Sequence, residues 1–264
     1  MERKTLFTFI AVYSFALAVT LFFGSNDEID ATTVVDQPTS YILQGDSVDS
    51  VAAAVESVGG EITHKLGIID SVAATLTKSQ RDELLVNSAI LNISADGAVK
   101  TAGGVAGGSP GAYANFPALV GADEVHAAGV TGRSVTVAIL DSGMHAEAEL
   151  QKDTNGIMRV VDRYNAIFDI EGEILLDKYG HGSHLTSIIL NTDYADDGSM
   201  RRNSISPDVK IIPVKAFDKN GQGTYANVIR GLDWILNHKE QYNIRVLNLS
   251  FSAPARSHYW DDPI

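Results

Sequence analysis

Hydrophobic positions between residues 40 and 100 alternate between short strand-like runs and the spacing of amphipathic helices. We predict strands over 41–43, 61–66, 68–76 and 89–94, and helices that begin after Asp46 and at about Ser79. The order is strand, helix, strand, strand, helix, strand. This order is typical of a small ferredoxin-like α+β domain.

The pattern changes from about Phe116. Residues 135–140 form a continuous apolar run, which is typical of a strand buried on both faces of a parallel sheet. Further strands are predicted over 209–217 and 244–250, and helices over 181–190 and 224–238. Alternating strands and helices predict an α/β domain with a doubly wound parallel sheet over 116–264.

Three segments outside these two domains have distinct compositions. Residues 1–24 carry Arg3 and Lys4 before an apolar stretch over 6–23, which is the pattern of an export signal. That stretch is also just long enough to span a bilayer. We favour a cleaved signal peptide, and a retained signal anchor is the alternative. The sequence thus predicts a secreted or extracytoplasmic protein whose membrane contact is limited to residues 6–23.

Polar and acidic residues over 25–39 indicate a linker, and a glycine-rich segment over 101–115 indicates a second one. Glycine-rich chain loses much backbone entropy on folding and has little side chain to bury. We therefore expect the second linker to be flexible, exposed and accessible to proteolysis, and we expect a maturation site within it.

Charge and cysteine content exclude several classes of function. The formal net charge is −13, which opposes binding to nucleic acid or to an anionic membrane surface. The chain has no cysteine, which excludes disulfides, thiolate zinc sites and a cysteine nucleophile. The absence of cysteine is compatible with either an oxidising or a reducing compartment.

Two residues carry the candidate chemistry. Asp141 directly follows the apolar run at 135–140, and ligands of open α/β sheets bind at the carboxyl ends of the strands. His181 begins a predicted helix between two glycines, where the helix N-terminus disfavours a charged imidazole. A nearby carboxylate is needed to stabilise that charge during catalysis, and Asp141 could supply it. His181 with His184 could instead be a metal-binding pair, although a third ligand at suitable spacing is not evident.

The residues around these two positions resemble those of a known family. The segment GRSVTVAILDSG, which contains Asp141, resembles the aspartate motif of the subtilases, the subtilisin-like serine proteases. GHGSHLTS, which contains His181, resembles their histidine motif, and the two occur in the family's order. KAFDKNGQGTY and VLNLSFS are similar to the two segments that line the family's substrate cleft. The resemblance covers about residues 116–264, and residues 40–100 resemble the family's inhibitory propeptide.

This resemblance implies the precursor of a secreted serine endopeptidase that hydrolyses peptide bonds in proteins through a Ser-His-Asp triad. Asp141 would orient the imidazole of His181, which would act as general base and then general acid. The backbone of a protein or peptide substrate would pair with two edge segments. These segments comprise Gly221, Gln222, Gly223, Ser250, Phe251 and Ser252. Ser252 stands where the family has glycine, which changes the expected width of the P1 pocket. Residues 40–100 would act as an intramolecular inhibitor.

The nucleophilic serine and the oxyanion asparagine of the family are expected beyond Ile264, so this chain alone is predicted to be inactive. Ser109 fits a G-x-S-x-G pattern, but the strand and helix that hold such a nucleophile are not predicted around it. No cofactor is required for the chemistry. A structural calcium ion at Asp193, Asp196 and Asp197 is conceivable, but these residues do not reproduce the family's ligand pattern, and a solvated surface is favoured.

Two other functions remain open. A naturally truncated chain could use residues 40–100 to inhibit related proteases or to assist their folding. Alternatively, an α/β metal-dependent hydrolase could use Asp141, His181 and His184.

Overall fold

The computed structural model describes residues 36–103, 116–195, 200–254, 258 and 262–263. Pro38 to Ile264 belong to one compact unit. Within the described residues, every helix is too short or too polar to cross a lipid bilayer. The predicted signal or anchor over 6–23 and the linker residues 104–115 lie outside the described residues.

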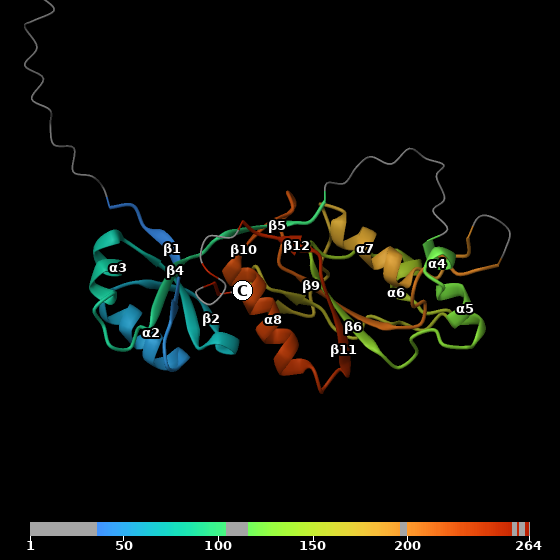
Figure 1. Ribbon diagram of the computed structural model, residues 1–264, viewed down its shortest axis with the longest axis horizontal. Helices are drawn as coiled ribbons and strands as arrows, with labels where there is room; N and C mark the ends of the chain where they lie inside the picture. The colour runs from blue at the N-terminus through green and yellow to red at the C-terminus, as the bar shows by residue number, and fades with distance from the viewer. Residues whose placement is uncertain (1–35, 104–115, 196–199, 255–257, 259–261, 264) are drawn as a thin grey trace, which may run out of the picture. The chain divides into compact units, whose positions relative to one another are not determined.

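An antiparallel sheet in the order β2-β3-β1-β4 forms the N-terminal part of the described chain (Figure 1). Its strands are β1 (Thr39–Gln44), β2 (Glu61–Leu66), β3 (Ser71–Leu76) and β4 (Asn92–Ala95). Helices α2 (Val48–Ser57) and α3 (Lys78–Leu84) begin at side-chain caps, which satisfy N–H groups that have no partner within a helix. Leu43, Val51, Val55 and Leu76 lie in the core that joins this sheet to its helices.

The elements of this sheet follow the predicted order, with one difference inside it. The apolar run over 68–76 is not a single strand, because Gly67–Ile69 form a 3₁₀ turn (η1) and β3 begins only at Ser71. Asp70 ends the turn with a positive φ of 50°. Aspartate tolerates this left-handed conformation better than most residues, so it allows the chain to reverse there.

A second sheet contains five strands in the order β11-β6-β9-β7-β8. They are β6 (Thr136–Asp141), β7 (Tyr164–Asn165), β8 (Ile170–Glu171), β9 (Lys210–Lys215) and β11 (Ile244–Leu249). β6 pairs in parallel with both β9 and β11, and all six of its residues are buried. A parallel strand covered on both faces explains why the sequence of β6 is continuously apolar rather than alternating.

Helices cover the two faces of this sheet. Ala138 and Leu140 lie in the same core cluster as residues of α8 (Tyr225–His238), whereas Val137 and Ile139 cluster with Leu190 of α7 (His181–Leu190). Because neighbouring side chains of a strand point to opposite faces, α7 and α8 pack on opposite sides of β6. The predicted α/β fold with a parallel sheet is confirmed. Three short helices complete this region: α4 (Phe116–Leu119), α5 (Ala122–Ala127) and α6 (Ala148–Gln151).

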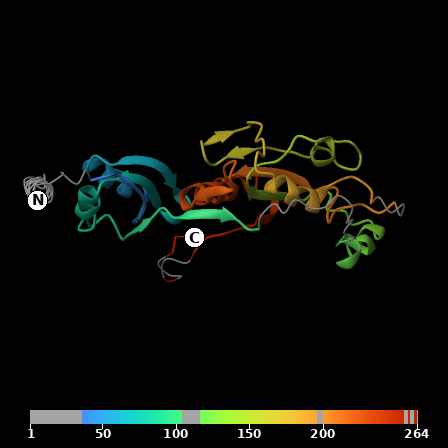
Figure 2. The same cartoon turned by 90° about the horizontal axis from the view of Figure 1, so that it is seen from above.

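A third sheet has β5 (Ala98–Thr101) as its central strand, with β10 (Gln222–Thr224) on one side and β12 (Phe251–Ser252) on the other (Figures 1 and 2). Both pairings are antiparallel. β5 is absent from the sequence prediction, which places the start of a flexible, exposed linker at Thr101. That expectation is wrong for Thr101, which is 9% exposed and belongs to β5. The flanking strands supply the hydrogen bonds that hold it.

Helix α8 also contacts the first sheet. The guanidinium of Arg230 donates to two carbonyl oxygens. One is that of Thr63 in β2 (2.9 Å), and the other is that of Ala166, the residue after β7 (3.0 Å). Nε2 of His64 lies 3.1 Å from Oδ1 of Asn227. These polar contacts fix the first sheet against α8.

Candidate active site

Asp141 is the last residue of β6 and is fully buried. Its Oδ1 accepts hydrogen bonds from the backbone N–H of Ser142 (2.7 Å) and from the hydroxyl of Ser142 (3.1 Å). Burial raises the pKa of Asp141, and the hydrogen bonds from His181 and Ser142 oppose that rise. The hydrogen bonds to Asp141 therefore offset part of the free-energy cost of burying its carboxylate.

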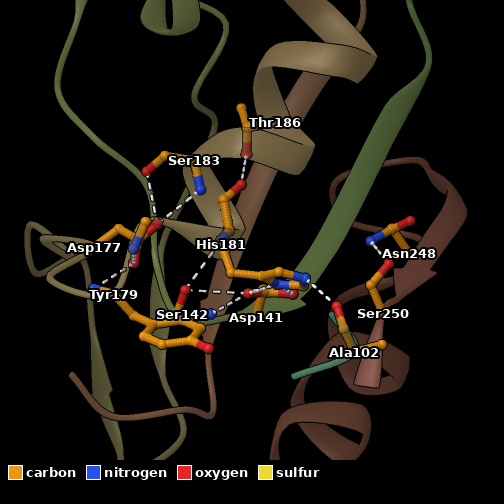
Figure 3. A network of polar contacts seen from close by, with 12 residues as sticks. Ala102, Asp141, Ser142, Asp177, Tyr179, His181, Ser183, Thr186, Asn248 and Ser250 are labelled. Atoms are coloured by element: carbon orange, nitrogen blue, oxygen red, sulfur yellow. Dashed lines mark hydrogen bonds and ion pairs between the residues drawn. The ribbon is translucent and has the colours of Figure 1, made fainter. Parts of the chain in front are cut away.

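His181 is the first residue of α7, and its imidazole faces this carboxylate (Figure 3). Nδ1 lies 2.8 Å from Oδ1 and 2.9 Å from Oδ2 of Asp141. The close approach of α7 to β6 depends on Gly182, because a Cβ there would lie 2.3 Å from the carbonyl oxygen of Gly143. The structure thus brings together the two residues that the sequence singled out.

The other nitrogen of the imidazole also faces an oxygen. Nε2 of His181 lies 2.7 Å from the carbonyl oxygen of Ala102, the residue that follows β5 (Figure 3). A carbonyl oxygen only accepts hydrogen bonds, so Nε2 can act only as the donor in this contact.

We call residues 98–102 the strap. Its backbone is bound on both sides, since the N–H of Thr101 donates to Gly221 (3.1 Å) and the N–H of Ala102 donates to Ser250 (2.9 Å). β10 pairs Gln222 with Lys100 and Gly223 with Val99. β12 pairs Phe251 with Thr101 and Ser252 with Lys100. All six residues that the sequence predicted to bind a peptide backbone therefore flank the strap.

Side chains of the strap alternate between the protein and solvent. Val99 is fully buried, whereas Lys100 is exposed. Val99 lies in the same core cluster as Phe217, whose ring is 5.5 Å from that of Phe251. The arrangement holds an extended peptide whose second residue is apolar and whose fifth residue presents its carbonyl to the imidazole.

Three polar residues that the sequence analysis did not select support this site: Ser142, Asp177 and Lys215. Asp177 accepts hydrogen bonds from the first turn of α7 and from the loop before it. Lys215 ends β9 opposite Asp141 in the parallel register and donates to the carbonyl oxygen of Ser142. The position of Asp177 four residues before a helix-opening histidine was a signal that could have indicated its role.

Metal-binding alternatives find little support in the described residues. No group of three or more His, Asp or Glu side chains among them could hold a metal ion. His184 is exposed on α7, whereas His181 is buried. Asp193 is exposed, and Asp196 and Asp197 lie outside the described residues.

The parallel sheet has helices on both faces, and a buried aspartate–histidine pair lies at its carboxyl edge, beside an extended segment of the chain itself. The family model of the subtilases matches residues 132–263, and the chain belongs to that family. The parallel-sheet domain and the two motifs predicted from the sequence lie largely within this match.

Curated relatives include the serine protease AprX of Bacillus subtilis, which is 26% identical over 51% of this chain and 29% of its own length. Subtilisin J of Geobacillus stearothermophilus is 24% identical over 92% of this chain and 60% of its own length. Fervidolysin of Fervidobacterium pennivorans, described as a keratinolytic enzyme related to subtilisin, has a similar structure. It matches 84% of this chain and 36% of its own with a TM-score of 0.60 and 20% identity, which supports the subtilisin-like fold. The chain spans less than two thirds of the length of these relatives.

Proposed function

We propose that this chain is the N-terminal part of a secreted serine endopeptidase precursor in which Asp141 and His181 are two members of a Ser-His-Asp triad. The observation that carries the proposal is the 2.7 Å contact between Nε2 of His181 and the carbonyl oxygen of Ala102. The carbonyl belongs to a backbone that is bound on both sides, so an extended peptide can lie with a peptide group beside the imidazole.

The chemistry follows from this geometry. A serine hydroxyl near Nε2 would lose its proton to His181 as it attacks the carbonyl carbon, and Asp141 would stabilise the imidazolium that forms. His181 would then return the proton to the leaving amine. The serine and the oxyanion asparagine are expected in sequence that would follow Ile264.

The strap supports a role for residues 40–100 as an intramolecular inhibitor. It fills the place where a substrate backbone would pair with β10 and β12. Since the carbonyl at His181 is that of Ala102, the Ala102–Gly103 bond is the proposed maturation site. Residues 1–24 would direct export, and one relative, a protease of Bacillus subtilis, is called extracellular.

The reading frame that follows the codon of Ile264 tests this proposal. We expect it to encode an asparagine at a strand end and a G-T-S-M-A sequence at the start of a helix. A stop codon in that place would contradict the proposal and would favour a non-catalytic inhibitor. The purified 264-residue chain is expected not to turn over a peptide ester, and measurable turnover would equally contradict the account.

A further inference from the structure

We propose that Asp177 is a positioning residue, which holds His181 in its orientation towards Asp141 by anchoring the chain on both sides of the histidine. Asp177 is 1% exposed and lies in the loop before α7. It does not touch the imidazole. Its effect on the dyad passes through the backbone that carries His181.

The carboxylate of Asp177 is shared between the two sides of His181 (Figure 3). Oδ1 accepts hydrogen bonds from the N–H groups of Tyr179 (3.1 Å) and Gly180 (2.8 Å), just before the histidine. Oδ2 accepts from the N–H (2.8 Å) and the hydroxyl (2.8 Å) of Ser183, two residues after it. His181 is therefore fixed between two points bound to the same rigid carboxylate.

Local sequence makes this anchor necessary. The residue at the N-terminal cap of α7 is Gly180, with a φ of 95° and no side chain to accept a hydrogen bond from the helix. The first N–H groups of a helix have no partner within it, and an anion there is favoured by the helix dipole. Asp177 supplies both the acceptor and the charge that Gly180 lacks.

The same network reaches the loop that follows Asp141. The hydroxyl of Ser183, which donates to Asp177, accepts a hydrogen bond from the N–H of His145 (2.9 Å). Lys215 ties the same two loops, since its ammonium donates to the carbonyl oxygens of Ser142 and of Leu176, the latter at 3.4 Å. The loops after β6 and before α7 are thus joined to each other beside the dyad.

Electrostatics favour the charged form of the Asp177 carboxylate. Burial raises the pKa of Asp177, but the hydrogen bonds from Ser183 and Gly180 outweigh burial and hold the pKa below its usual range. Asp177 is also the carboxylate with the largest favourable charge interaction at Lys215. In Asp177→Asn, the side-chain amide NH2 would face backbone N–H groups that now donate to a carboxylate oxygen, so those hydrogen bonds would be lost.

The test uses the whole chain and the low-field proton NMR signal of the hydrogen bond between His181 and Asp141, identified by its absence in His181→Gln. In Asp177→Asn we expect the exchange of this proton with water to accelerate about tenfold or more, because losing hydrogen bonds to a charged group loosens the dyad by at least that factor. The matched control is Asp208→Asn. Asp208 is a buried carboxylate that accepts hydrogen bonds from Thr131 and Thr154, away from the dyad.

Both variants should lower the unfolding midpoint, but only Asp177→Asn should change the His181 signal. An unchanged signal in Asp177→Asn, or an equal change in Asp208→Asn, would overturn the inference. If Asp177→Asn does not fold, Ser183→Ala decides, with a smaller acceleration expected and an unchanged signal contradicting the role. The inference rests on the proposed function only in taking His181 as the general base. The signal reports dyad geometry without any catalysis, so failure of one proposal is distinguishable from failure of the other.

Discussion

The carbonyl oxygen of Ala102 lies 2.7 Å from Nε2 of His181, so a segment of the chain itself occupies the position beside the buried histidine. Antiparallel pairing on both sides fixes the segment that ends there.

Val99 anchors the strap, because its side chain is fully buried. Val99→Ala should weaken docking of the strap by about 2 kcal/mol, through lost burial and the cavity left behind. Hydrogen exchange of the strap amides should then accelerate roughly thirtyfold. Lys100→Ala is the control, since that side chain is exposed on the same strand. Equal effects of the two variants would contradict the role of Val99.

Gly182 permits the contact between α7 and β6. In Gly182→Ala the new Cβ would lie 2.3 Å from the carbonyl oxygen of Gly143 and 3.2 Å from Cβ of Asp141, so the helix must shift. We expect a loss of about 1–3 kcal/mol in the free energy of unfolding, as for other overpacked sites, together with loss of the low-field signal of His181. His184→Ala changes an exposed position of the same helix and should leave both unchanged. A Gly182→Ala protein of wild-type stability would show that the contact is not tight.

His64 makes the packing of the first sheet on α8 sensitive to pH. Burial lowers the pKa of His64 from 6.5, and the charge of Arg230 lowers it further, while Asn227, Asp96 and Asp169 act in the opposite direction. Below pH 6.5 the unfolded chain therefore takes up a proton that the folded chain resists. The contribution of His64 to the free energy of unfolding is therefore fully present above pH 6.5. It is lost as the pH falls from 6.5 through the lowered pKa of His64 in the folded chain.

Urea unfolding above and below pH 6.5 measures this effect. His64→Gln should flatten the pH dependence of the unfolding free energy, whereas His126→Gln, at a position on α5, should preserve it. If the unfolding free energy of His64→Gln changes with pH as steeply as that of the wild type, a group other than His64 causes the pH dependence.

Arg230 bridges the two sheets through one guanidinium that reaches two backbone carbonyls, those of Thr63 and Ala166. Lysine cannot reproduce both contacts, because its ammonium is a single nitrogen, whereas Nη1 and Nη2 of Arg230 each donate to one of the two carbonyls. Arg230→Lys should cost about 1.5–3 kcal/mol in the free energy of unfolding, the range for hydrogen bonds to charged groups. The control, Arg245→Lys, replaces an exposed arginine. Unfolding midpoints that do not separate the two variants would refute the bridging role.

Sequence reasoning succeeded where periodicity and local motifs determine structure. The helix over His181–Leu190 has the predicted bounds, and the continuously apolar run became β6, an interior strand of the parallel sheet. It failed for β5, a strand of four residues whose stability comes from β10 and β12 rather than from its own composition. Distant partners also explain why Asp177 and Lys215 were missed, since their importance depends on which loops the fold brings together.

We propose that the strap pairs with β10 and β12 as a substrate backbone would, with the Ala102–Gly103 bond beside the dyad. The most direct test is the N-terminus of the protein produced from the complete reading frame, determined by mass spectrometry for the wild type and for His181→Ala. The account predicts a processed wild-type chain that begins at Gly103 and an uncut His181→Ala precursor. A mature chain that begins elsewhere, or a Gly103 end that forms equally in His181→Ala, would contradict it.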